Sequence, residues 1–136
     1  HKNLYQVHQR VANKFREGCV LIAGDAAHIN NPLGGMGMNF GFHDAFNLTD
    51  KLNKIWFNDG SEDLLDLYER QRKTVASEYL QAQSIENKKN LERKNQADRE
   101  KFFDELREIT SDDEKLLKYL RRVAMIEGIE RAASIT

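Results

Sequence analysis

The residues best suited to chemistry in this chain lie in one stretch, residues 21–45, with the sequence LIAGDAAHINNPLGGMGMNFGFHDA. A short apolar run ends there on Gly24 and Asp25, and three glycines follow within four positions: Gly34, Gly35 and Gly37. A carboxylate at the carboxyl end of a strand can accept hydrogen bonds from ligand hydroxyls, because ligands collect at that edge of α/β sheets. Glycines beside it can adopt positive φ and keep Cβ atoms out of the ligand's path.

The glycine cluster comes directly before an amphipathic pattern, which predicts that it leads into a helix. The first amides of a helix lack partners within the helix, and the helix dipole favours negative charge there. Together with Asp25, these amides predict a pocket for a molecule with a polyol and an electron-rich, potentially anionic edge. The residue types alone leave an alternative open, in which Asp25 is a turn or cap residue and the glycines only make a tight loop.

Short strands before the glycines and helices after them would have to position these residues. Residues 4–12 roughly alternate between apolar and polar, which indicates a strand weakly. The run Cys19–Gly24 is continuous, apolar and flanked by glycines, which is typical of a buried strand. Within it, Cys19 is expected to be a small buried residue. A helix should begin within about two residues of Met38, and helices should dominate from there on.

The spacing of apolar residues predicts which helix faces are buried. The first helix should bury a face made of Met38, Phe42, Ala45, Thr49, Leu52 and Ile55. It should end at Asn58–Gly60, and Ser61 should cap the second helix. The buried side of the second helix should contain Leu64, Leu65, Tyr68, Val75, Tyr79 and Ala82.

The second half of the chain is much more polar. Residues 86–101 mix charges of both signs, which favours a solvated helix extension or a helix–helix connection over a functional charge cluster. Ser111 and Glu114 are spaced as a capping box, and Gly128 is expected to end or bend the last helix. The predicted fold is mainly α with one or two short strands. Its predicted division is residues 1–83, which carry the site, and residues 84–136, a helical extension.

Composition excludes several classes of function. Charged residues make up 32% of the 136 residues, yet the net charge is −1, which argues against a surface for nucleic acid or anionic membrane. No apolar run approaches the roughly 20 residues of a membrane span. Cys19 is the single cysteine, so no internal disulfide framework is possible. These features suit a reducing cytosol, and we expect a cytoplasmic location.

Residues 24–48, GDAAHINNPLGGMGMNFGFHDAFNL, closely resemble the second flavin-binding motif of the class A FAD-dependent aromatic hydroxylases, the p-hydroxybenzoate hydroxylase family. The family pattern is G-D-A-A-H, a short spacer, P-x-G-G-x-G-x-N, and then a helix with D-A-x-N-L. Every part is present in order. The flanks, including LLDLYERQR at residues 64–72, also resemble the family, so that the likeness covers about residues 4–80. The family often has proline after the E-R pair, where this chain has Lys73 or Thr74, which lets the helix continue.

The resemblance implies a role for particular residues at the flavin. Asp25 resembles the residue that hydrogen-bonds the ribityl chain of FAD, and Gly24 lets the backbone approach that chain and the pyrophosphate. Pro32 resembles the proline beside the isoalloxazine ring. The loop and helix start whose amides face the pyrimidine edge of the flavin correspond to Gly35, Gly37, Met38 and Asn39. His28 is expected to be structural rather than a general base.

The family's reaction is then the implied function, with FAD as cofactor and no metal. NAD(P)H reduces FAD, and one atom of O2 is transferred to a phenol-like aromatic substrate. The family's first motif, G-x-G-x-x-G, is absent, so we expect this chain to be the C-terminal part of an α/β FAD-binding fold. Its partners would be the aromatic substrate, O2 and the missing N-terminal part of the same protein. Two alternatives remain: a related flavoprotein reductase or halogenase, and a non-enzymatic helical interaction module.

Overall fold

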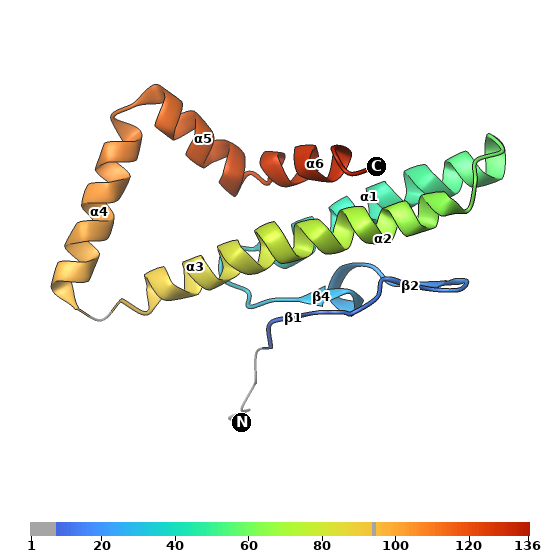
Figure 1. Cartoon of the computed structure of the whole chain (residues 1–136). Helices are drawn as coiled ribbons and strands as arrows, with labels where there is room; N and C mark the ends of the chain where they lie inside the picture. The colour runs from blue at the N-terminus through green and yellow to red at the C-terminus, as the bar shows by residue number, and fades with distance from the viewer. Residues whose placement is uncertain (1–7, 94) are drawn as a thin grey trace.

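The computed structural model describes residues 8–93 and 95–136 of the chain, and they are mainly helical, as the sequence predicts (Figure 1). The described residues contain four strands of two residues each, and not the predicted one or two: β1 (Arg10–Val11), β2 (Arg16–Glu17), β3 (Val20–Leu21) and β4 (His28–Ile29). A 3-10 turn, η1 (Gly24–Ala26), lies between β3 and β4. The helical elements are α1 (Met36–Phe57), α2 (Asp63–Val75), the π-helical turn η2 (Ala76–Gln81), α3 (Ala82–Leu91), α4 (Gln96–Thr110), α5 (Asp113–Val123) and α6 (Ile126–Ala133).

The strands form two separate antiparallel pairs. In one pair β1 lies beside β4, and in the other β2 and β3 form a hairpin that turns at Gly18 with φ of +57°. The predicted strand over Cys19–Gly24 is confirmed only for Val20–Leu21, and the prediction that it is buried was wrong, since Val20 is 65% exposed. Cys19 is exposed as well. Successive side chains of a strand point to opposite faces, so Leu21 packs against the buried cluster of Phe15 while Val20 faces solvent. Apolar composition alone does not reveal this. Residues 4–7 of the other predicted strand lie outside the described residues.

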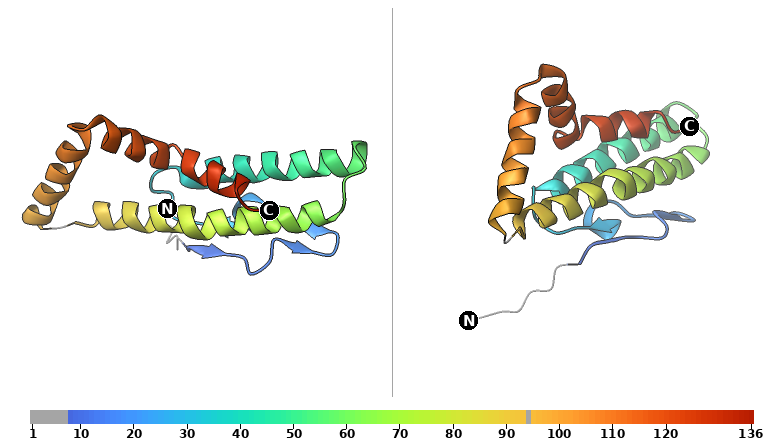
Figure 2. Two further views of the ribbon diagram at one scale, coloured as in Figure 1. Left: turned by 45° about the horizontal axis from the view of Figure 1, so that its top comes forward. Right: turned by 60° about the vertical axis from the view of Figure 1, so that its left-hand side comes forward.

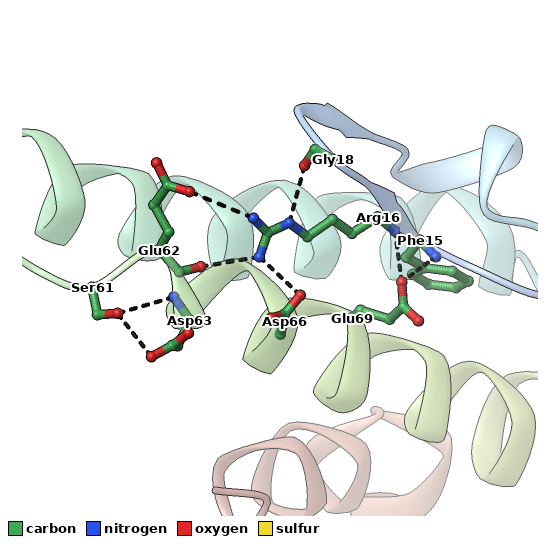
Figure 3. Close-up of polar contacts among 8 residues, drawn as sticks. All are labelled: Phe15, Arg16, Gly18, Ser61, Glu62, Asp63, Asp66 and Glu69. Carbon is green, nitrogen blue, oxygen red and sulfur yellow. Dashed lines mark hydrogen bonds and ion pairs between the residues drawn. The ribbon is translucent and has the colours of Figure 1, made fainter.

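Helix α2 holds the hairpin through carboxylates (Figure 3). The side chain of Glu69 accepts hydrogen bonds from the backbone amides of Phe15 and Arg16, at 2.7 and 2.6 Å. The guanidinium of Arg16 in turn contacts Asp66 Oδ1 at 2.8 Å and the carbonyl of Glu62 at 3.1 Å. The side chain of Phe15 is buried in a cluster with Ala27, Tyr68 and Ala76. The hairpin is thus held against α2 by these polar contacts and by the buried ring of Phe15.

The two long helical runs, α1 and α2–η2–α3, lie side by side over the strands (Figures 1 and 2). Helix α1 begins at Met36, within the predicted two residues of Met38, and Asn58 follows its end as predicted. Its predicted buried face is wrong, however, because Met38 is 70% and Phe42 54% exposed. The buried residues of α1 are Met36, Phe40, Asp44 and Lys51. Two of these are charged, so the spacing of apolar residues alone does not identify the buried face of α1.

The second helical run is continuous past Lys73 and Thr74, as expected from the absence of proline. Its buried residues then recur every four positions: Tyr68, Arg72, Ala76, Leu80 and Ser84. A regular α-helix of 3.6 residues per turn would rotate that row away from the core, and the wider π turn of η2 keeps it facing inward. Ala82 is therefore exposed, contrary to the prediction. The boundary at residue 83 stays a prediction, since the helix crosses it without a break.

Helices α4 and α5, here called the arm, stand apart from the rest, and α6 returns to pack against α2 (Figure 2). Asp112, not Ser111, caps α5, because its carboxylate accepts from the amides of Glu114 and Lys115. The chain bends at Met125, which has φ of +62°, and not at Gly128. Gly128 is buried inside α6, where an added Cβ would lie 3.2 Å from Val75. No helix in residues 8–93 or 95–136 is both long and apolar enough to cross a membrane.

Candidate functional site

The predicted site residues converge on one pocket of about 350 Å³ at the start of α1. Five of the seven line it: Asp25, Pro32, Gly35, Gly37 and Met38. The other lining residues are His8, Ile29, Asn30 and Asn31. The pocket is thus bounded by η1, by the loop after β4 and by the first turn of α1. Segments ten or more residues apart in sequence meet there, and that they bind a cofactor stays a prediction.

Glycine is required at Gly34 and Gly35 for a different local reason than at Gly37. Gly34 and Gly35 adopt left-handed backbone conformations, with φ of +88° and +64°, so that the loop can turn into α1. Gly37 lies inside the helix and has no positive φ. A Cβ at Gly37 would lie 2.8 Å from Asn30 Oδ1 and 3.9 Å from Asp25 Oδ1, on the pocket side. The glycine at this position therefore leaves room for the side chain of Asn30, which a Cβ would displace. That Gly34, Gly35 and Gly37 keep Cβ atoms out of a ligand's path stays a prediction.

The remaining two predicted residues, Gly24 and Asn39, lie just outside the pocket lining. The backbone of Gly24 approaches that of Gly41, and a Cβ on Gly41 would stand 3.5 Å from the Cα of Gly24. Both glycines thus bring η1 close to α1. Asn39 donates a hydrogen bond from its side chain to the carbonyl of Gly35 at 3.0 Å, which secures the turn before the helix.

A buried ionic network supports the turn that carries Asp25. Asp44 Oδ2 accepts from the backbone amide of Gly24 at 2.9 Å and contacts His28 Nε2 at 2.5 Å. Its other oxygen accepts from Arg72 Nε at 2.6 Å. The guanidinium also lies over the ring of Phe40, 5.7 Å from the ring centre. These side chains link η1, β4, α1 and α2.

The electrostatics of this network favour an ionised Asp44. Burial by itself raises the pKa of Asp44, but the hydrogen bond from His28 and the charge of Arg72 outweigh it and hold the pKa below its ordinary value. His28 is 1% exposed and lies beneath the loop, in the structural place expected for it. The sequence analysis assigned no role to Asp44 or to Arg72. The D-A-x-N-L motif was the available signal for Asp44, but no sequence spacing connects it to Arg72.

The pocket combines an exposed carboxylate with the start of a helix. The carboxylate of Asp25 is exposed at the pocket, and no hydrogen bond to it comes from the residues that the structure describes. Gly35 also lines the pocket, and no other side chain or backbone segment lies within 4 Å of the point where its Cβ would stand. The first amides of α1 belong to residues at the edge of this pocket and have no partners within the helix. An acceptor for hydroxyls thus lies beside donors for an anionic edge. Within the described ranges, no cluster of acidic, histidine or cysteine side chains is arranged to hold a metal ion.

Comparison with known proteins finds relatives along the first two thirds of the chain. The family profile described as "FAD binding domain" matches residues 1–83. 6-Hydroxy-3-succinoylpyridine 3-monooxygenase of Pseudomonas putida and para-nitrophenol 4-monooxygenase of Pseudomonas sp. strain WBC-3 are each 42% identical over 87 residues, 64% of this chain and 22% of the relative. Pentachlorophenol 4-monooxygenase of Sphingobium chlorophenolicum is 44% identical over 77 residues, 57% of this chain and 14% of the relative. The chain thus spans about a fifth of these proteins, or less.

Solved structures extend the likeness into the C-terminal helices. The p-nitrophenol 4-monooxygenase of Pseudomonas putida DLL-E4 has a TM-score of 0.80 at 30% identity, over 92% of this chain and 32% of that chain. The Diels-Alderase of pyrroindomycin biosynthesis has a TM-score of 0.71 at 30% identity, over 85% of this chain and 24% of that chain. With a family profile over more than half of its residues and relatives that are monooxygenases of aromatic compounds, the chain belongs to the FAD binding domain family.

Proposed function

We propose that this chain forms the ribityl and isoalloxazine side of the FAD site in a monooxygenase that uses NAD(P)H and O2 to hydroxylate a phenol-like aromatic substrate. The observation that carries the proposal is that Asp25, Pro32, Gly35, Gly37 and Met38 line one pocket at the start of α1. FAD, when bound, supplies the electron transfer from NAD(P)H and the activation of O2. A cytoplasmic location, a placement toward the C-terminal end of the parent protein and partnership with its remaining segments belong to the same proposal.

The residues of this chain bind and orient the cofactor in the proposal. Asp25 accepts hydrogen bonds from the ribityl hydroxyls, and the pyrrolidine of Pro32 packs beside the ring system. The first amides of α1, at Gly37 and Met38, face the pyrimidine edge, where the helix N-terminus favours negative charge. Asp44 keeps the turn of Gly24 and Asp25 in place through its hydrogen bond to the Gly24 amide. Asn39 holds the loop at Gly35.

Replacing the carboxylate tests the ribityl contact. In the full-length protein that carries residues 1–136, Asp25→Ala should weaken FAD binding by about 1.5 to 3 kcal/mol, because a hydrogen bond to a charged group is lost. The measurement is a flavin fluorescence titration of the apoprotein. Asp104→Ala is the matched control, since Asp104 is an exposed carboxylate paired with Arg107 on α4. Unchanged FAD affinity in Asp25→Ala would contradict the proposed placement of the cofactor.

Adding a side chain at Gly37 tests the proposed position of the isoalloxazine ring. Gly37→Val should leave whatever FAD still binds mispositioned, because a side chain there enters the space beside Asn30 and Asp25. NAD(P)H oxidation should then yield hydrogen peroxide in place of hydroxylated product, since the reacting groups are out of position. Asp25→Ala, once saturated with FAD, should keep most of its coupling. The ratio of product formed to NAD(P)H consumed, with 4-nitrophenol or pentachlorophenol as probes, is the measurement. Full coupling in Gly37→Val would argue against the proposal.

One structural neighbour favours a second candidate. The solved protein with a TM-score of 0.71 is described as a Diels-Alderase and not as a monooxygenase. A flavoprotein of this family with other chemistry, such as a reductase, would keep the same FAD contacts. Such a protein would bind FAD, and Asp25→Ala would weaken that binding. When supplied with NAD(P)H, O2 and a phenol, however, it would form no hydroxylated product. The same assays therefore separate cofactor binding from the reaction type.

A further inference from the structure

The loop between β4 and α1 is held from one side by helix α3. Asn30 donates from its side-chain amide to Ser84 Oγ at 3.2 Å and to the carbonyl of Asn31 at 2.9 Å. Asn31 donates to the carbonyl of Ser84 at 3.1 Å, and Asn87 donates to the carbonyl of Leu33 at 3.3 Å. Ser84 is fully buried. This set of bonds connects the pocket loop to Ser84 and Asn87 of α3, which lie past the end of the family match at residue 83.

These bonds fix the orientation of the Asn30 side-chain amide at the pocket. Both hydrogens of its side-chain nitrogen are used toward Ser84 and Asn31, so its carbonyl oxygen is directed to the opposite side. That oxygen and Asp25 Oδ1 lie 2.8 and 3.9 Å from the one point where a Cβ of Gly37 would stand. No described residue donates a hydrogen bond to Asn30 Oδ1. Two acceptor oxygens, from Asn30 and Asp25, therefore lie beside Gly37 at the pocket.

We propose that Asn30 is a further ligand-binding residue, whose Oδ1 accepts a hydrogen bond from a ribityl hydroxyl of FAD, and that Ser84 is the positioning residue that orients it. The inference rests on the proposed function and deepens it. Two neighbouring acceptors match a polyol, in which successive carbons each carry a donor. Asp25 takes one hydroxyl of the chain, and Asn30 takes another.

The π turn η2 explains how Ser84 comes to face this loop. The buried row along the second helical run continues from Tyr68 to Ser84 only because η2 corrects the helical phase. Gln81, the last residue of η2, offers its carbonyl to Gln9, whose side-chain oxygen accepts from Asn31. Departures of this kind from α-helical geometry occur often at functional sites. Here the π turn directs polar groups of α3 to the pocket loop.

The experiment uses the full-length protein, freed of cofactor, and titrates FAD and three analogues that lack the 2′, 3′ or 4′ ribityl hydroxyl. Asn30→Ala should weaken FAD binding about 3- to 10-fold, the worth of one hydrogen bond. For the analogue that lacks the partner hydroxyl, Asn30→Ala and the unaltered protein should bind equally. Asn53→Ala, at an exposed asparagine of α1, is the matched control and should change nothing.

A double-mutant comparison tests Ser84. Ser84→Ala should weaken FAD binding less than Asn30→Ala, and the double variant should be no worse than Asn30→Ala alone, because Ser84 acts through Asn30. Additive losses would overturn the positioning role, and an equal loss for FAD and all three analogues would overturn the ribityl contact. If the unaltered protein binds FAD and Asp25→Ala weakens it while Asn30→Ala does not, only this inference fails. If the unaltered protein binds no FAD, the proposed function itself fails.

Discussion

The pocket side of the molecule and the arm use the same kinds of charged residues in opposite ways. Beneath the pocket, Asp44 and Arg72 are almost fully buried and joined to each other, to His28 and to the Gly24 amide. In the arm, α4 and α5 bury no residue, and ion pairs such as that between Arg107 and Asp104 stand in solvent. An exposed ion pair contributes about 0 to 1 kcal/mol, because water screens it. A buried charge that loses its partner costs far more.

The largest expected effect comes from breaking the buried pair. Arg72→Ala should lower the free energy of unfolding by about 3 to 5 kcal/mol, because Asp44 would keep a buried charge without its cationic partner. Arg70→Ala is the matched control on the same helix, and as an exposed residue it should change stability by less than about 0.5 kcal/mol. Urea unfolding of the variants measures both. Similar losses in the two variants would show that burial does not distinguish these arginines.

A smaller effect is expected from the cap of α5. Asp112→Ala should destabilise that helix by about 0.5 to 2 kcal/mol, because two amides lose their side-chain acceptor. The loss should stay in the arm, since no residue of α4 or α5 is buried against the rest. Hydrogen exchange should therefore quicken for α5 amides and stay unchanged for α1. Asp113→Ala, which removes a carboxylate of the same turn that caps no amide, should have the smaller effect, and the reverse order would contradict the assignment of Asp112.

The smallest effect concerns pH and His43. Burial and the nearby charge of Arg72 lower the pKa of His43, although Asp44 acts in the opposite direction. The unfolded chain then binds more protons than the folded one in this range, so stability should rise with pH. The contribution of His43 is complete above its ordinary pKa of about 6.5 and is lost as pH falls through the lowered value. Between pH 7 and pH 5, the free energy of unfolding measured with urea should change less steeply with pH in His43→Gln than in the unaltered protein. An unchanged pH dependence would show that His43 does not contribute to it.

The sequence by itself determined the helical class, the start of α1 and the pocket residues around Gly37, because these follow from local signals. A glycine-rich turn before an amphipathic run predicts where a helix begins, and the motif spacing brings Asp25, Pro32 and Gly35 to that helix start. The stop of α1 at Asn58 follows from the same kind of signal.

Only the tertiary structure decided which faces are buried and which polar groups support the pocket. Asp44 lies inward because Arg72, 28 residues away, neutralises it, and no periodicity of apolar residues contains that pairing. Val20 is exposed because it lies on the face of the hairpin opposite to Leu21, which packs against the cluster of Phe15, and Ser84 faces the pocket loop because a π turn shifts the helix phase. Each of these depends on contacts between distant segments. Local sequence patterns report the preferences of one segment, whereas burial and charge pairing depend on what packs against it.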